Sequence, residues 1–393
     1  MAALTRREVM RRLAAAGVAA LGVDAARAQG VAAPLGVAAP LGDGARLSDL
    51  GMELTAQQRD AGVQLLERHA TVDTHSHPGR FFLTALTDPT PTTRAFGEPF
   101  EAAAIADLEA GRVSAALFST VSDMRLLEQT ASQGLKAGRD FQPGEAYADY
   151  RRQLGELKSL IASHAVAAGL KPADIEAAHR GHKVAAVFAV EGGDFIEDRL
   201  ERVQEAFRDG VRAVTLVHYH INQIGDIQTE SPVHNGLTPL GKSIVREMNR
   251  AGMIMDLAHA TSAVTKDVIN ASHKPIMISH TNLATATSTH PRLISVEHAK
   301  MVAAADGIIG SWPSGVGQTT FADYIDSIRR LVDAVGIDHV AIGTDMDANF
   351  KPVFRSYRDW GLMPAALLAR GLREDEAAKV MGGNFLRVFK ANL

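Results

Sequence analysis

The sequence predicts an α/β fold, a (β/α)8 barrel with a metal site at the C-terminal ends of its strands. Two observations support this prediction. Short apolar, β-branched runs alternate with longer helical patterns, and most of these runs end in a histidine or a carboxylate. The eight expected strands span residues 70–75, 114–119, 184–190, 213–217, 253–257, 275–279, 307–311 and 339–343.

Helical periodicity fills several of the intervals between strands, for example LTPLGKSIVREMNRA at residues 237–251 and the segment at residues 321–335. Eight such repeats suit a barrel, whose usual size is about 250 residues plus insertions. A doubly wound open sheet is the alternative. Most nucleotide-binding sheets of that kind carry a G-x-G-x-x-G loop after the first strand, and no such loop follows residues 70–75.

Polar residues after the apolar runs predict where the chemistry lies. In a barrel, the C-terminal ends of the strands form the catalytic face. A single histidine at a strand end is more often structural than a ligand, but packing alone hardly explains His or carboxylate residues at six strand ends. They are His75 and His77 after the first run, Glu191 after the third, His218 after the fourth, His259 after the fifth, His280 after the sixth and Asp345 after the eighth.

The first of these ends is the stretch TVDTHSHPG at residues 71–79. Alternate residues of an extended strand point to the same side, so the rings of His75 and His77 can face one point. A surface H-x-H in a turn is the alternative for this motif taken alone. The other strand ends favour a metal-ligand pair.

Together these residues meet the needs of a two-metal hydrolase, in which one carboxylate reaches both ions and neutral imidazoles flank it. Glu191, followed by two glycines, is the expected bridge. Asp345 is expected to move a proton from the activated water to the leaving group, and His218 to donate a hydrogen bond to the developing oxyanion. The expected ligands beside Glu191 are His75 and His77 for one ion, and His259 and His280 for the other.

The N-terminus has the features of a twin-arginine export signal at residues 1–28: paired Arg6-Arg7, an uncharged run of 11 residues from 13 to 23, and an Ala-Arg-Ala cleavage site ending at Ala28. An amphipathic helix is the alternative, but Ala, Gly and Val fill all faces of the run. It is too short for a stable membrane anchor, which needs about 20 residues. We therefore expect export to the periplasm, a variable linker at residues 29–60 and a hydrolase barrel at residues 61–393.

Charge and composition exclude several classes of partner and chemistry. Residues 1–28 carry five arginines and two acids, so their removal takes the formal net charge from −4 to −7. This balance, without a basic cluster, argues against nucleic acid and anionic membrane surfaces as partners. The chain has no cysteine, which excludes disulfides, thiolate ligands and a cysteine nucleophile.

Over nearly the whole expected mature chain, the sequence resembles the membrane (renal) dipeptidase family of the metal-dependent hydrolase superfamily. The resemblance rests on DTHSHPG, VEGGD, TLVH, GLTPLGKSIVREMNRAGMIMDLAH, ISHTN, HPRLIS, GIDHVAIGTDMD and VMGGNFLRVF. It implies a zinc-dependent dipeptidase that cleaves the amide bond of dipeptides through a metal-bridging hydroxide. The implied roles are His75 at the first Zn2+, Glu191 bridging, His259 and His280 at the second Zn2+, His218 and Arg292 on the substrate, and Asp345 as acid and base.

The chain departs from the family pattern at two places near these residues. The usual H-x-D of the first strand is H-x-H here, so His77 replaces a carboxylate and makes the site one charge more positive. One extra residue separates His280 from Arg292, and Leu293 stands where Asn is frequent. The alternative for Arg292 is a surface arginine after Pro291.

Two further functions stay open on the sequence alone. A related binuclear metal amidohydrolase could cleave N-acyl amino acids, β-lactams or lactones, because fold and metals do not fix the substrate. A metal-binding periplasmic module without catalysis is the other, although an acid such as Asp345 beside the ligands has little use in it. The expected partners are a small dipeptide substrate and, since barrel surfaces often pair, a second copy of the chain in a homodimer.

Overall fold

The computed structural model describes residues 51–130 and 134–393. The expected export signal and the expected linker up to residue 50 lie outside the described residues. The boundary expected at residue 61 lies inside helix α3 (Ala56–Arg68), which Thr55 caps and whose Leu65 and Leu66 are buried.

Eight parallel strands close into a barrel, as the sequence predicts. The pairing of Asp73 in β1 with Ile342 in β11 completes a circle in the order β1, β2, β6, β7, β8, β9, β10, β11. Each strand overlaps one of the expected runs. Their bounds are β1 Val72–Ser76, β2 Ala115–Val121, β6 Ala185–Glu191, β7 Val211–Thr215, β8 Ile254–Asp256, β9 Met277–Thr281, β10 Ile308–Ser311 and β11 Val340–Ile342.

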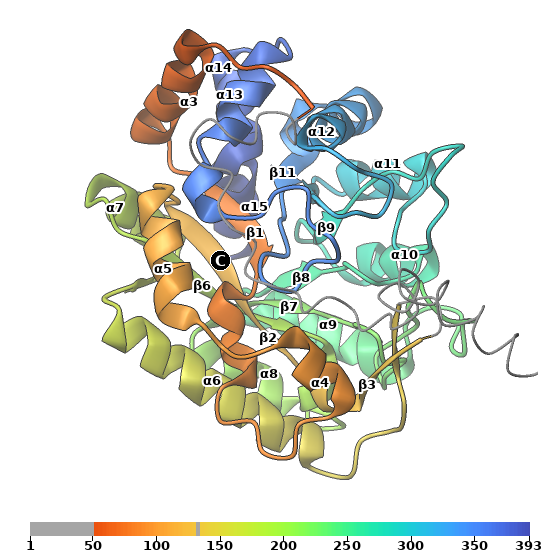
Figure 1. Cartoon of the computed structure of the whole chain (residues 1–393). Coiled ribbons are helices and arrows are strands. Elements are labelled where there is room, and N and C mark those ends of the chain that lie inside the picture. Colours follow the sequence, from red (N-terminus) through yellow and green to blue (C-terminus); the bar gives the residue numbers. More distant parts are fainter. Residues whose placement is uncertain (1–50, 131–133) are drawn as a thin grey trace, which may run out of the picture.

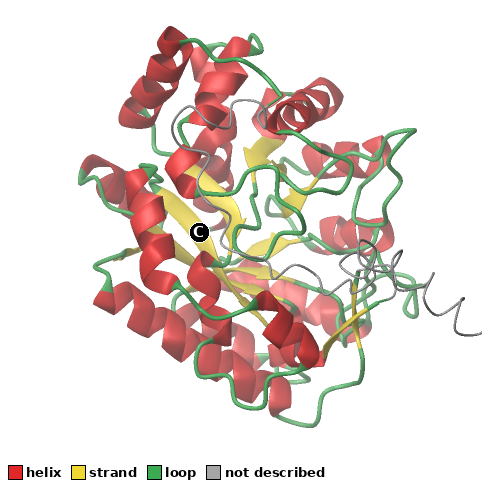
Figure 2. Ribbon diagram, viewed as in Figure 1, coloured by secondary structure: helices red, strands yellow, loops and turns green. Residues whose placement is uncertain are grey.

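Helices surround the strands, as Figures 1 and 2 show. Of the two segments with helical periodicity, residues 321–335 form α12 and residues 239–251 form α9, whose first turn is capped by Thr238 and opened by Pro239. Within residues 51–130 and 134–393, no helix combines the length and apolar character needed to cross a membrane. The other α-helices of the described residues are α4 Pro91–Phe96, α5 Glu101–Ala110, α6 Glu145–Ser163, α7 Pro172–Arg180, α8 Glu201–Arg208, α10 Ser262–Ala271, α11 Val296–Ala304, α13 Leu362–Ala369, α14 Glu374–Ala378 and α15 Asn384–Asn392.

The structure adds three short strands that the sequence did not predict. β3 (Leu127–Gln129) and β4 (Leu135–Ala137) form an antiparallel hairpin, and β5 (Ala167–Ala168) pairs with the start of β6. Segments of two or three residues are too short for a recognisable alternation of apolar and polar positions.

Helix α15 closes the N-terminal end of the barrel. Phe385, Val388 and Phe389 belong to one buried apolar cluster with residues from the starts of several strands, including Val72 and Ala115. Leu367, Leu372, Val380 and Phe385, in the C-terminal part of the chain, are all buried as well. With one end packed by α15, the opposite, C-terminal end remains for a site.

Candidate metal centre

Six of the predicted site residues lie at or just beyond the C-terminal ends of strands. His75 and His280 are the last residues but one of β1 and β9, and Glu191 is the last residue of β6. Three others each lie three residues beyond a strand end: His218 after β7, His259 after β8 and Asp345 after β11. Barrel closure therefore brings all of them to one end of the molecule.

Two buried groups of side chains at this end could each hold a cation, and Glu191 belongs to both. In the first group, the Nε2 atoms of His75 and His77 lie 3.1 Å apart. His75 Nε2 is 3.2 Å from Glu191 Oε1, and His77 Nε2 is 3.4 Å from Glu191 Oε2. The ring of His77 thus lies where a ligand of this candidate group would lie.

The second group consists of Glu191, His259 and His280. Here the two Nε2 atoms lie 3.2 Å apart, and they are 3.1 Å and 3.7 Å from Glu191 Oε1. In both groups, imidazole nitrogens and a carboxylate oxygen converge on a common point. This donor set suits a borderline divalent cation such as zinc.

The two glycines after Glu191 let the chain turn sharply away from the site. Gly192 has a φ of 94°, in the region that favours glycine. A Cβ atom at Gly193 would lie 2.3 Å from Ile224 Cδ1. Without these glycines, the loop after β6 could not pack closely behind the shared carboxylate.

Hydrogen bonds at the far side of two rings fix how they face the site. His77 Nδ1 lies 2.8 Å from the carbonyl oxygen of Ser119, and His280 Nδ1 lies 3.0 Å from Ser279 Oγ. Because a carbonyl oxygen only accepts, Nδ1 of His77 carries a proton. A neutral His77 ring therefore presents the lone pair of Nε2 to the group, as a metal ligand must.

In the second group, burial and neighbouring charges favour the protonation states in which these residues can bind a cation. Burial, together with the charges on Arg292 and His218, lowers the pKa of His259 well below its ordinary value. Burial and the neighbouring His75 and Arg292 do the same for His280. Burial opposes ionisation of Glu191, but the surrounding histidines outweigh it and hold the carboxyl pKa well below its usual range. Neutral rings around an anionic carboxylate are the forms that bind cations.

His77 differs from these rings. Burial alone would lower its pKa, but its contacts with the carboxylates of Asp345 and Glu191 outweigh burial and raise the pKa to about 10. The Asp345 oxygen lies 3.4 Å from His77 Nε2. A cation entering the first group would therefore displace a proton from His77.

Backbone strain accompanies two of the site residues. His259 and Asp345 have φ values of 67° and 55°, which non-glycine residues adopt rarely and at a cost. Buried carboxylates hold the chain nearby. Asp256 accepts hydrogen bonds from the backbone nitrogens of Ala258 and Ser279, and Asp73 accepts one from the backbone nitrogen of His75. These two acids thus support the chain that carries the rings.

Arg292 is 1% exposed, so its alternative as a surface arginine is wrong. Its Nη1 donates to Gln228 Oε1 at 2.8 Å, and its guanidinium carbon lies 5.4 Å from the centre of the Trp312 ring. Its positive charge acts on His218, His259 and His280. The structure thus places this arginine beside the candidate metal centre.

Sequence reasoning missed two residues that contact the predicted ones. Asp123 accepts a hydrogen bond from His218 Nδ1 at 2.6 Å, and Gln228 contacts Arg292. Asp123 lies four residues beyond the expected strand at residues 114–119, so its position after a strand end could have identified it as a candidate site residue. Gln228 lies in a long loop after β7, where no local pattern distinguishes it.

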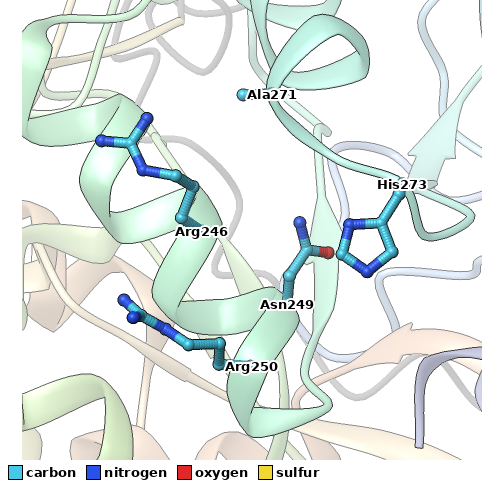
Figure 3. A pocket seen from close by; sticks show the side chains of 5 residues that line it. All are labelled: Arg246, Asn249, Arg250, Ala271 and His273. Carbon is cyan, nitrogen blue, oxygen red and sulfur yellow. The ribbon is translucent and has the colours of Figure 1, made fainter.

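A surface hollow elsewhere is separate from this centre. It is lined by side chains of α9 and of the segment around the end of α10 (Figure 3). These segments lead into the starts of β8 and β9, at the end of the barrel opposite the site. Its lining residues are Arg246, Asn249, Arg250, Ala271 and His273, and none belongs to the two groups that could hold a cation.

Residues 59–392 match the family model described as membrane dipeptidase (peptidase family M19). The chain is 31% identical over 264 residues to Dipeptidase verJ of Clonostachys rogersoniana, covering 64% of this chain and 68% of that protein. It is also 31% identical over 230 residues to Dipeptidase tcpJ of Claviceps purpurea, covering 56% of this chain but only 54% of that protein. The match therefore spans about half the length of the second relative.

Solved structures share the fold. A metallopeptidase from Rhodobacter sphaeroides, crystallised with a phosphinate mimic of the dipeptide L-Ala-D-Ala, superposes with a TM-score of 0.69. The superposition covers 83% of this chain and 99% of that one, at 18% sequence identity. At this identity the similarity supports the barrel fold only. The chemistry of the site is inferred from the residues of this chain.

Proposed function

Because the chain belongs to the membrane dipeptidase family, peptidase family M19, we propose that it is a zinc-dependent dipeptidase. The observation that carries the proposal is the position of Glu191, whose carboxylate is shared by two buried groups of imidazoles. A shared carboxylate is what a pair of metal ions needs to act on one water. His75 and His77 would hold one ion, and His259 and His280 the other.

When bound, two zinc ions would supply Lewis acidity, which would make a water easier to deprotonate and would polarise the peptide carbonyl. The chain's own residues supply the rest. Asp345, beside the first group, would take the proton of the attacking water and return it to the departing amine. His218 would donate a hydrogen bond from Nε2, which lies 3.5 Å from Glu191 Oε2, to the carbonyl oxygen as it becomes negative. Since its Nδ1 proton goes to Asp123, this donation requires the doubly protonated ring. Burial opposes that form, but the charges of Asp123 and Glu191 outweigh burial and raise the pKa of His218.

The buried guanidinium of Arg292 would bind the substrate's C-terminal carboxylate. Arginine is suited to this because its fork of N–H donors matches a carboxylate. A longer peptide has no carboxylate at that distance from the scissile bond. The proposed substrates are therefore dipeptides, and the phosphinate dipeptide mimic bound by the related metallopeptidase is consistent with that size.

The test is hydrolysis of L,L and L,D dipeptides by the untreated protein, after chelator treatment and after zinc is added back, with metals counted in each state. We expect activity to disappear with the metals and to return with two zinc ions per chain. Steady activity in chelator would contradict the metal mechanism. Cleavage of N-acyl amino acids, β-lactams or lactones in place of dipeptides would favour a related amidohydrolase.

A matched variant separates an enzyme from a metal-binding module. Asp345 is not one of the proposed ligands, and replacing it by asparagine keeps the size of the side chain. The variant should retain both zinc ions and lose on the order of 100-fold or more in kcat. Two bound zinc ions with no turnover by the unaltered protein would favour the binding module.

We also propose, from the N-terminal sequence, that the protein is exported to the periplasm through the twin-arginine route. Replacing Arg6 and Arg7 together by lysine should retain the protein in the cytoplasm, which cell fractionation would detect. The expected homodimer stays a prediction that light scattering on the purified protein would test.

A further inference from the structure

The contact between Asp123 and His218 connects a loop beyond β2 with the candidate metal centre. Asp123 is fully buried, and its Oδ1 accepts from His218 Nδ1 at 2.6 Å. Its Oδ2 accepts from the backbone nitrogen of Tyr219 at 2.9 Å. One carboxylate therefore fixes both the His218 ring and the backbone that follows it.

The other ring nitrogen of His218 points toward the metal-ligand groups. Its Nε2 lies 3.5 Å from Glu191 Oε2, and the ring packs edge-on against His259 with 4.4 Å between ring centres. Because an ionised carboxylate only accepts hydrogen bonds, the proton between Asp123 and His218 lies on Nδ1. Turning the ring over would break this contact and move Nε2 away from Glu191.

We propose that Asp123 is a positioning residue, which holds the His218 ring so that Nε2 faces the carbonyl oxygen of the substrate. This inference rests on the proposed function. Asp123 acts through the histidine, since its two hydrogen bonds go to His218 and to Tyr219. Such partners of active-site rings commonly affect activity by about 10- to 100-fold.

A matched control pair lies close by, with Asp194 in the turn after β6 and His220 two residues after His218. Asp194 is buried, and its Oδ1 lies 2.7 Å from His220 Nδ1, so the local chemistry is that of Asp123 and His218. The His220 ring points in a different direction from the His218 ring. His220 Nε2 faces the exposed Asp140 at 3.4 Å, whereas His218 Nε2 faces Glu191.

The test is a double-mutant cycle on kcat for a dipeptide. Asp123→Asn should lower kcat about 10- to 100-fold with little change in KM or in zinc content. In the His218→Ala background, the same substitution should change kcat less than about threefold, because the ring that it positions is gone. Asp194→Asn should cost the same factor in both backgrounds. If Asp123→Asn also costs the same factor in both, the inference is wrong.

A second measurement needs no turnover. Long-range 1H–15N spectra of zinc-loaded protein labelled at histidine report which ring nitrogen carries a proton, and His218→Ala assigns the His218 signals. We expect a proton on Nδ1 that shifts or disappears in Asp123→Asn, or in Asp123→Ser if the first variant does not fold. Unchanged His218 signals would overturn the inference. If the His218 signals are as expected but the protein cleaves no dipeptide, the proposed function is wrong and the position of the His218 ring is still explained by Asp123.

Discussion

Arg292 donates from Nη1 to Gln228 Oε1 at 2.8 Å, while its Nε and Nη2 atoms are buried without a hydrogen-bond partner among the described residues. Leaving charged donors unpaired in a buried position is costly. Gln228 is itself held by its backbone nitrogen, which donates to the carbonyl oxygen of His259. The arginine is thus anchored at one nitrogen and has two free for an anionic group.

Arg292→Ala should raise KM for dipeptides about 10- to 100-fold, because a hydrogen bond to a charged group contributes about 1.5–3 kcal/mol. Steady-state kinetics with a dipeptide and with its C-terminal amide would measure this. The dipeptide amide has no C-terminal carboxylate for Arg292 to bind, so the KM for this substrate should change much less. Equal losses on both substrates would show that Arg292 does not bind the carboxylate.

Gln228→Ala should raise KM for dipeptides by a smaller factor than Arg292→Ala, about threefold to tenfold. The guanidinium keeps its charge and its other donors for the carboxylate, and loses only the hydrogen bond to the Gln228 amide that orients it. The measurement is KM in the single variants and in the double variant. If the two losses multiply in the double variant, Gln228 does not act through Arg292.

Removing individual ligands should separate the two metal positions. His75→Ala and His280→Ala should each leave about one zinc ion per chain, whereas Glu191→Gln should weaken both positions because both groups share this residue. Elemental analysis after dialysis gives the counts. Glu201→Gln, on the exposed start of α8, is the control that should keep both ions. Full occupancy in Glu191→Gln would contradict a shared ligand.

Zinc binding to the first group should become stronger as pH rises. The pKa of His77 is raised to about 10, so its ring is protonated at neutral pH and must lose that proton to bind a cation. Each pH unit below the pKa should weaken this site about tenfold. Calorimetric titration in buffers of different ionisation enthalpy should detect release of about one proton. Asp345→Asn removes one of the carboxylates that raise the pKa, so it should reduce this dependence.

His298 should make the fold less stable in acid. Burial lowers the pKa of its ring to about 4, and its Nε2 lies 2.8 Å from Thr265 Oγ1. The unfolded chain therefore binds a proton more readily than the folded one. Above pH about 6.5 the ring is neutral in both the folded and the unfolded chain, so this contribution to stability is fully present. As pH falls from there toward 4, the free energy of unfolding should decrease by about 1.4 kcal/mol per pH unit. Urea unfolding at pH 7 and pH 5 should show this loss, and His298→Gln should reduce it. The same loss in both proteins would rule His298 out as its source.

The strands and the types of ligand could be read from the sequence because both are local patterns. A strand is recognised by alternation over a few residues, and the side chain after it lies at the C-terminal end of the barrel whatever its neighbours are. His75, Glu191, His259 and His280 were found in this way, and the structure brings them together. The resemblance to a family added Arg292, which follows no strand directly.

The sequence by itself determined the barrel and the donor atoms at its open end. Only the tertiary structure decided which loop residues support them. His218 meets Asp123 across 95 positions, and Arg292 meets Gln228 across 64. The reason is physical: local periodicity fixes the direction in which a side chain points, whereas the distance between two loops depends on how every strand and helix between them packs.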